Sequence, residues 1–206
     1  MKTVVLTGPV GGGKSLLAGM LEARGALVVD ADRLGHRVLE DPRVRAELTE
    51  ALGPGILDGG RIDRRRLGEL VFRDAAAMAV LNRVTHPVLA ARIDDRLAES
   101  AAEGGHPLAV LEAAVYFLLP VTFAPDLVVT VTAPPEIRVR RLQERNGLDH
   151  DAALARVRSQ QDLARQWEHA DLIVVNEEGP PVLERAADDI IARLGLTGPG
   201  NSAPDQ

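Results

Sequence analysis

Short apolar runs rich in Val and Leu recur along the chain, and stretches with helical spacing lie between them. Runs of this length and composition predict strands that are buried on both faces, as in a parallel sheet. We place five of them, at residues 3–7, 26–29, 108–111, 127–131 and 172–175. Because helical patterns alternate with these strands, the sequence predicts an α/β fold with a five-stranded parallel sheet between two layers of helices.

The stretch between the second and third strands departs from this alternation. Its spacing predicts helices at residues 44–52, 64–72, 75–84 and 88–102, with no strand among them. A turn-rich GPGILDGG lies at residues 53–60. His86-Pro87 separates the last two predicted helices, and Pro87 suits the first turn of the second one. We therefore expect one domain over residues 1–196, with a helical insertion at about 42–104 in a core formed by about 1–41 and 105–196.

A second departure spans residues 138–166, which are rich in arginine and carry a break signal at Asn146-Gly147. We expect this segment to be a lid. Residues 197–206 are small, polar and rich in Pro and Gly, so we expect a disordered tail.

Bulk properties narrow the classes of function. The 206-residue chain has a formal net charge of −6, which argues against a broad electrostatic contact with nucleic acid. It contains no cysteine, so disulfides and thiol chemistry are excluded. The most apolar stretch, residues 108–135, is interrupted by acids and prolines and indicates two buried strands, not a membrane span. We expect a cytoplasmic protein, a monomer or small homo-oligomer, that has small-molecule partners.

The strongest motif follows the first predicted strand and opens the first predicted helix. It fits G-x-x-x-x-G-K-[ST], a phosphate-binding loop. Glycines let backbone N–H groups point into one concavity, and the helix directs its positive end to the same place. We assign nucleotide binding to this loop and the residue after it: Gly8, Pro9, Val10, Gly11, Gly12, Gly13, Lys14, Ser15 and Leu16.

Two side chains of this loop carry chemistry. Lys14 can reach the β- and γ-phosphates of ATP, and the Ser15 hydroxyl can ligate Mg²⁺. Lys14 and Lys2 are the only lysines in a chain whose other basic residues are arginines. A compact ammonium cannot be replaced by a planar guanidinium in a tight pocket, so this isolated lysine indicates function.

A phosphate-binding loop alone leaves the reaction open. No Asn in the chain is followed by Lys, so the guanine-reading N-K-x-D motif of GTPases is absent. ATPases that drive motion are usually larger. A small chain with an inserted helical region and an arginine-rich segment favours a kinase, because the insertion can hold the acceptor and the arginines can close over the phosphates.

Acidic residues follow two of the predicted strands, at the edge where open α/β sheets bind ligands. Asp30 and Asp32 follow the second strand, and either can cap the next helix or take the proton of an acceptor hydroxyl. Glu112 closes the third strand. It is either a solvent-facing acid or a carboxylate that holds Mg²⁺ through water.

Three arginines of the lid segment, Arg138, Arg141 and Arg145, recur at helical spacing and share a face. They can clamp phosphates or form a solvated face with neighbouring acids.

Three further residues are candidates for ligand contact. Asn176 follows the fifth strand and is a candidate for contact with adenine, or a turn residue. Arg64 can attract an anionic acceptor or simply begin a helix. His86 is either a helix-boundary residue or a substrate contact.

Taken together, these motifs resemble those of the dephospho-CoA kinase family over residues 4–191. The matching pieces are LTGPVGGGKS, VVDADRLGHRV, DGGRIDRRRLGELVF, LNRVTHPVL, RRLQERNGL with the downstream RVRSQ, and ADLIVVNEEG. The resemblance implies that ATP phosphorylates the ribose 3′-hydroxyl of dephospho-coenzyme A, which is the last step of coenzyme A biosynthesis.

The resemblance also implies residue roles. Asp32 is the catalytic base, Lys14 acts on the phosphates, and Arg141 and Arg145 are the lid arginines. It places His86 in the substrate domain. We also expect substrate contacts from Asp30, Arg64 and Glu112.

This chain departs from the family pattern at a few positions. It has EAAVYFLLP, beginning with Glu112, where the family shows D-x-P-L-L-F-E, and Leu16 stands where Thr is usual. Arg138 stands where the family often has Gln. Two alternatives remain: another small-molecule kinase, acting on a nucleoside or nucleotide, or a non-catalytic nucleotide-binding regulatory module.

Overall fold

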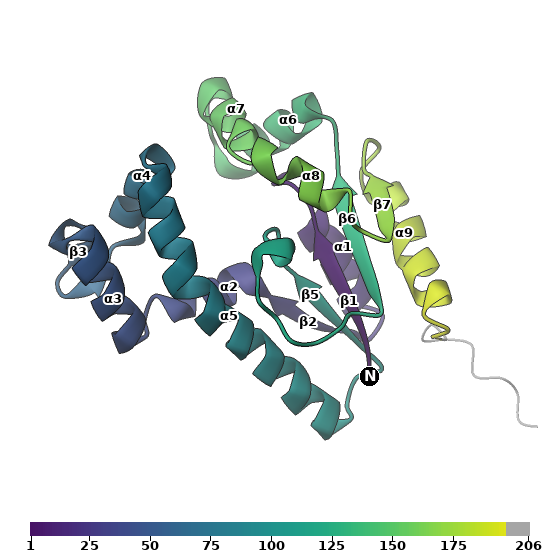
Figure 1. The fold of residues 1–206 in the computed structure, drawn as a ribbon. Coiled ribbons are helices and arrows are strands. Elements are labelled where there is room, and N and C mark those ends of the chain that lie inside the picture. Colours follow the sequence, from purple (N-terminus) through teal and green to yellow (C-terminus); the bar gives the residue numbers. More distant parts are fainter. Residues whose placement is uncertain (197–206) are drawn as a thin grey trace, which may run out of the picture. The chain divides into compact units, whose positions relative to one another are not determined.

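The main sheet of the protein has five strands, and Figure 1 shows it in a computed structural model that describes residues 1–196. All its strand pairs are parallel, and the spatial order is β2-β5-β1-β6-β7. The strands are β1 (Lys2–Thr7), β2 (Leu27–Asp30), β5 (Leu108–Glu112), β6 (Leu127–Thr132) and β7 (Leu172–Val175). The prediction of an α/β fold with a five-stranded parallel sheet is confirmed.

The register of this sheet aligns the polar strand ends. Leu6 of β1 lies opposite Glu112 of β5, and Glu112 lies opposite Asp30 of β2. Since all strands run the same way, their carboxyl ends share one edge, and the phosphate-binding loop leaves β1 there.

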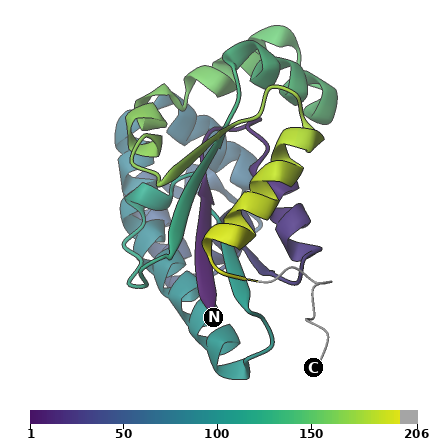
Figure 2. The same ribbon diagram turned by 90° about the vertical axis from the view of Figure 1, so that its right-hand side faces the viewer.

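Helices α1 (Lys14–Glu22) and α9 (Pro180–Arg193) cover one face of the sheet, as Figure 2 shows for α9. Fully buried Leu17 and Leu21 of α1 and Leu183 of α9 form one core cluster with Val4 and Val129 of the strands. This continuous apolar layer anchors α1, so the loop before it is attached to a rigid element at each end.

The other face of the sheet is closed near β6 by the short helix α8 (Ala164–Trp167). The Trp167 indole N–H donates to the carbonyl of Ala114 at 3.1 Å, and the Thr130 hydroxyl donates to the carbonyl of Trp167 at 2.8 Å. These bonds tie the arginine-rich segment back to the sheet.

That segment contains α6 (Pro135–Asn146), α7 (His150–Arg158) and the 3₁₀ turn η3 (Gln161–Leu163). A small apolar cluster joins α6 to α7, with Leu142 and Ala153 at its centre. Gly147 follows α6 with φ of 65°, a left-handed conformation that suits glycine. The break that the sequence predicts at Asn146-Gly147 is therefore present.

The chain divides into two compact units. The first contains the sheet and comprises residues 1–30, 97–117 and those from 124 onward. The second comprises residues 31–96 and 118–123. Its elements are α2 (Ala31–Val38), α3 (Pro42–Leu52), η1 (Pro54–Ile56), α4 (Arg64–Arg73) and most of α5 (Ala75–Glu103), while the 3₁₀ turn η2 (Tyr116–Leu118) spans the second boundary. The unit thus begins eleven residues before the insertion predicted from the sequence.

One continuous helix replaces the two predicted on either side of His86-Pro87. Helix α5 runs for 29 residues with Pro87 inside it. Proline removes one backbone donor and crowds the preceding turn, which favours a helix boundary. Residues on both sides of Pro87, including Val84 and Ala90, are buried, so packing of the long helix outweighs this local preference.

A small hairpin also lies where the sequence predicts only a turn. Strands β3 (Leu57–Asp58) and β4 (Arg61–Ile62) pair antiparallel. Gly59 and Gly60 join them with φ of 53° and 81°, the positive values that a tight two-residue hairpin requires. Strands of two residues are too short to produce an alternating pattern. The turn is therefore predictable from the sequence, and the strands are not.

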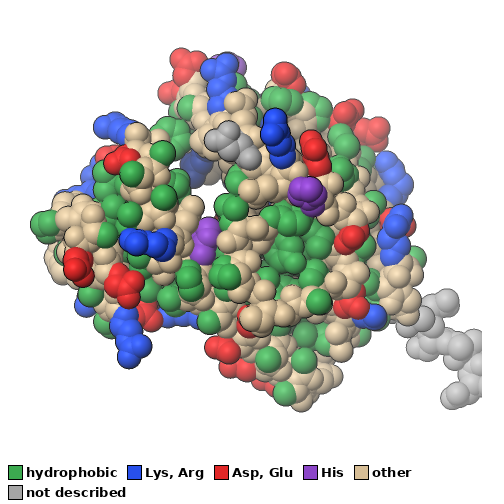
Figure 3. Space-filling view, viewed as in Figure 1, with side chains coloured by type: hydrophobic (Ala, Val, Ile, Leu, Met, Phe, Trp, Pro, Cys, Tyr) green, Lys and Arg blue, Asp and Glu red, His purple; other side chains and the backbone are tan. Residues whose placement is uncertain are grey.

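Acidic and basic side chains are interspersed on the face of the molecule in Figure 3. Over residues 1–196, no helix combines the length and apolarity that crossing a membrane requires. The predicted tail at 197–206 lies outside the described residues.

Candidate active site

The phosphate-binding loop joins the end of β1 to the start of α1, as the sequence predicts. Gly8, Gly11 and Gly13 have positive φ values, and Gly13 precedes the first turn of α1 with φ of 114°. The loop also lies against β6, because a Cβ atom on Gly8 would approach the Val131 carbonyl oxygen to 2.4 Å. The shape of the loop therefore depends on glycine at these positions.

Lys14 folds over this loop. Its ammonium donates to the carbonyls of Gly8 at 2.8 Å and Pro9 at 3.1 Å. The positive charge is thus held above the turn whose N–H groups would receive a phosphate, at the N-terminus of α1 where an anion is favoured.

Ser15 and Glu112 come together from positions 97 residues apart. The Ser15 hydroxyl, in the first turn of α1, donates to Glu112 Oε1 at 2.6 Å. Two hard oxygen donors at the end of a phosphate-binding loop suit Mg²⁺, which binds few protein ligands and keeps several waters. Among the described residues no cluster of three or more His, Cys, Asp or Glu side chains forms a metal cage, so nucleotide phosphates and water would complete the coordination.

The two acids of the D-A-D sequence differ in position. Asp30 is the last residue of β2 and lies opposite Glu112 in the sheet, in the first unit. Asp32 is an exposed residue in the first turn of α2, in the second unit. Because α2 begins at Ala31, Asp32 lies inside the helix and is not its N-cap.

Arg141 hydrogen-bonds to the backbone of the loop. Its guanidinium donates to the carbonyl of Gly11 at 3.1 Å and to the carbonyl of Asn176 at 2.9 Å. Burial lowers its pKa from the ordinary value, and the neighbouring charge of Arg140 adds to the shift. Arg141 thus holds the loop and the residue after β7 through their backbone carbonyls.

The other two lid arginines differ from Arg141. Arg145 donates to the side chain of Asn146 at 3.1 Å and is exposed. Arg138 packs its backbone against Gly11, and burial lowers the pKa of its guanidinium. Within the described residues, the buried Nε of Arg138 has no hydrogen-bond partner.

Asn176, a candidate for contact with adenine, is buried beside the loop. Its side chain is only 2% exposed, and its amide nitrogen donates to the carbonyl of Gly12 at 2.9 Å. Its amide oxygen accepts from the N–H of Gly179 at 3.0 Å. With both ends hydrogen-bonded inside the protein, the Asn176 amide positions the loop.

Gln160 is a site residue that the sequence analysis does not select. Its side-chain oxygen accepts a hydrogen bond from the N–H of Val10 at 2.7 Å, so the segment after α7 contacts the middle of the loop. The only signal for it in the sequence is its place at the end of RVRSQ. A glutamine between helices carries no chemistry that would single it out.

Two further candidates lie in the second unit. His86, within α5, is half-buried, and burial lowers its pKa more than the nearby Leu118 backbone raises it. Arg64 is the exposed first residue of α4 and lines a cavity of that unit. Four of these features thus lie in the first unit: the loop, Glu112, Arg141 and Asn176. The second unit contains Asp32, Arg64 and His86.

Comparison with known proteins gives a consistent result. A family model described as dephospho-CoA kinase matches residues 2–181. The dephospho-CoA kinase of Anaeromyxobacter dehalogenans is 36% identical over 196 residues, which cover 94% of this chain and 92% of the relative. That of Deinococcus radiodurans is 36% identical over 192 residues, which cover 93% and 92%.

Solved structures agree. TT1252 from Thermus thermophilus aligns with a TM-score of 0.75 at 34% identity, over 96% of this chain and 98% of that one. Dephospho-CoA kinase from Campylobacter jejuni aligns with a TM-score of 0.57 at 24% identity, over 94% and 97%, which supports the fold alone.

Proposed function

Because the chain belongs to the dephospho-CoA kinase family, which uses ATP to phosphorylate the ribose 3′-hydroxyl of dephospho-coenzyme A, we propose how its own residues perform this transfer. The first unit holds ATP by its phosphates, and the second unit supplies the acceptor and the base. The observation that supports this division most is the loop itself, with Lys14 folded over it and Ser15 bonded to Glu112 at 2.6 Å.

In the proposed transfer, the Asp32 carboxylate accepts the proton of the 3′-hydroxyl. The hydroxyl oxygen forms a bond to the γ-phosphorus while the bond to the β,γ-bridging oxygen breaks, and ADP leaves. Lys14 and the loop N–H groups stabilise the charge that moves toward the bridging oxygen. Asp32 suits the role of base because it is exposed, at the start of a helix that follows the carboxyl end of β2.

We propose Mg²⁺ as the cation, held by the Ser15 hydroxyl with Glu112 acting directly or through water. When bound, it offsets charge on the β- and γ-phosphates. Arg141 orients the loop, and Arg145 is the exposed lid guanidinium available to the moving phosphoryl group. We further propose a cytoplasmic location, where ATP is abundant, and a monomer or small homo-oligomer.

The activity itself is tested by incubating the protein with Mg-ATP and dephospho-coenzyme A and measuring the mass of the product. We expect a gain of one phosphoryl group. A preference for a nucleoside over dephospho-coenzyme A in a coupled ADP assay would overturn the assignment, and ATP binding with no transfer to any acceptor would indicate a non-catalytic module.

The base is tested by Asp32→Asn, which keeps the shape of the side chain. We expect kcat to fall by ~10²–10⁴-fold while ATP affinity stays unchanged, because a positioned base contributes this much. The matched control is Asp30→Asn, two residues earlier on β2, which we expect to have a smaller effect. If Asp30→Asn abolishes turnover and Asp32→Asn does not, the base is Asp30.

A further inference from the structure

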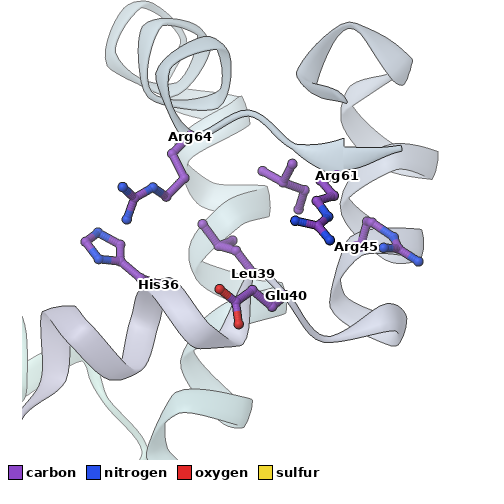
Figure 4. A pocket seen from close by; sticks show the side chains of 7 residues that line it. His36, Leu39, Glu40, Arg45, Arg61 and Arg64 are labelled. Carbon is purple, nitrogen blue, oxygen red and sulfur yellow. The ribbon is translucent and has the colours of Figure 1, made fainter. Parts of the chain in front are cut away.

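A cavity of about 530 Å³ lies within the second unit. Four of its elements each contribute one basic side chain: His36 from α2, Arg45 from α3, Arg61 from β4 and Arg64 from α4. Figure 4 shows Arg64 and His36 at one side of the cavity and Arg61 and Arg45 at the other, with Leu39 and Glu40 between them.

The charge of this cavity is unbalanced. Three guanidinium groups line it and Glu40 is its one carboxylate, so the guanidiniums exceed the carboxylates by two. Within the described part of the chain, Arg45, Arg61 and Arg64 form no ion pair. By contrast, Arg65 pairs with Glu69 at 3.0 Å and Arg66 pairs with Asp58 at 3.4 Å.

The local fold keeps these guanidiniums on the cavity. Asp63 caps α4 by accepting from the N–H groups of Arg65 and Arg66, and this fixes the direction of the first turn that begins at Arg64. The Gly59-Gly60 turn brings β4 back along β3 and so places Arg61 beside α4. Gathering like charges is unfavourable unless an anion neutralises them, and guanidinium forks match phosphate oxygens in geometry.

The cavity also lies at a useful distance from the proposed base. Asp32 and His36 are four residues apart on α2, so they share a face of the helix and are about 6 Å apart along its axis. In dephospho-coenzyme A the 3′-hydroxyl and the 5′-diphosphate are attached to the same ribose ring. The spacing from Asp32 to His36 therefore matches the reach from the 3′-hydroxyl of such a ribose to its diphosphate.

We propose that Arg45, Arg61 and Arg64, with His36, bind the diphosphate of the acceptor and thereby select dephospho-coenzyme A over nucleosides that lack it. This inference rests on the proposed function and deepens it. These residues recognise substrate and take no part in bond making, so their loss affects acceptor affinity and leaves ATP binding unchanged.

The test compares Arg61→Gln, Arg64→Gln and the double variant with Arg65→Gln as the matched control. Arg65 is adjacent to Arg64, is exposed and does not line the cavity. For each protein, KM is measured for dephospho-coenzyme A, for ATP and for adenosine, which has the 3′-hydroxyl and no diphosphate. Thermal melting of each variant checks that it is folded.

We expect each cavity substitution to raise KM for dephospho-coenzyme A about 10-fold or more, the effect of losing a charged hydrogen bond to phosphate. KM for ATP and kcat/KM for adenosine stay within about 2-fold of the parent. Arg65→Gln behaves like the parent. Arg61→Lys recovers part of the loss, since an ammonium keeps the charge without the fork.

Two results would overturn the inference. One is an active parent enzyme whose cavity variants keep the parental KM for dephospho-coenzyme A. The other is an equal loss with adenosine, which would place the arginines against the nucleoside. Failure of the proposed function is distinct, because the parent protein would then transfer no phosphoryl group to dephospho-coenzyme A. Calorimetric titration with dephospho-coenzyme A provides the same comparison without turnover.

Discussion

At the scale of single residues, the site separates side chains that face a ligand from those that hold the loop. Arg141, Gln160 and Asn176 each hydrogen-bond to the backbone of residues 10–12. Their polar groups are therefore used within the protein, and their substitution would change the shape of the loop. Lys14 and Ser15 are also hydrogen-bonded within the protein, but they lie in the first turn of α1, where a phosphate is favoured.

Lys14→Ala removes the one ammonium at the loop. We expect kcat to fall by ~10²–10³-fold, because a preorganised charge at the transferred phosphate is lost, while the melting temperature changes little. Steady-state kinetics and thermal melting measure both. Lys2→Ala is the matched control, since Lys2 pairs with Asp126 at 2.7 Å on the surface and such pairs contribute little. Comparable activity of the two variants would contradict the assignment.

At the scale of elements, the contact between the phosphate-binding loop and β6 decides which residues the loop can contain. Gly8 and Gly12 both lie against the Val131 carbonyl, with room for no Cβ atom. Within α1, however, Gly19 is exposed and has open space around it. Glycine is thus required in the phosphate-binding loop and replaceable at position 19 of α1.

Gly8→Ala should therefore lower the free energy of unfolding by about 1–3 kcal/mol and weaken ATP binding, because it introduces both a clash and strain at φ of 122°. Gly19→Ala should raise the free energy of unfolding by about 0.5–1 kcal/mol, since alanine is the better helix former. Urea unfolding and ATP titration measure these effects. Equal effects of the two substitutions would show that the contact with β6 does not constrain the loop.

At the scale of the whole molecule, the protein joins a nucleotide-holding unit to a unit that carries the proposed base and the basic cavity. The second unit has its own buried residues, such as Val44, Leu48 and Ile56, and its own polar ties. Arg92 of α5 pairs with Asp41 at 3.2 Å, and Asp94 accepts from the N–H of Thr122 at 2.9 Å. Stability can therefore be altered in this unit without touching the phosphate-binding loop.

The pH dependence of stability tests whether His86, a residue of the second unit, affects the free energy of unfolding. Burial lowers its pKa below the ordinary 6.5, so between the lowered value and 6.5 the unfolded chain binds more protons than the folded one. The stability from neutral His86 is present above pH 6.5 and is lost as pH falls through this interval. We expect urea midpoints between pH about 7.5 and about 5.5 to fall less in His86→Gln than in the parent. Equal slopes would contradict this.

Much of the fold is predictable because the strongest patterns belong to its most buried parts. The sheet strands are short apolar runs, and the phosphate-binding loop has glycines at fixed spacing before a helix. The uninterrupted helix through Pro87 is not predictable locally, because tertiary packing outweighs the preference of proline. The β3–β4 hairpin is missed because its strands have two residues each.

The site residues also divide into those that local patterns in the sequence predict and those that tertiary packing decides. Ser15 and Glu112 meet because the loop and β5 lie at the edge that the carboxyl ends of the parallel strands share. Gln160 and the buried contacts of Asn176 depend on which surfaces of distant segments touch, and no spacing in the sequence encodes that. The basic cavity is likewise hidden in the sequence, since Arg45, Arg61 and Arg64 are no more conspicuous there than Arg65 or Arg66.

The hydrogen bonds of the phosphate-binding loop have a consequence for how the protein forms during translation. The loop leaves the ribosome well before its partners Val131, Arg141, Gln160 and Asn176, which lie far later in the chain. A nascent chain that ends before residue 176 lacks the amide that supports Gly12. We therefore expect the nascent chain to hold a nucleotide only after the last strand of the sheet and Asn176 have been made.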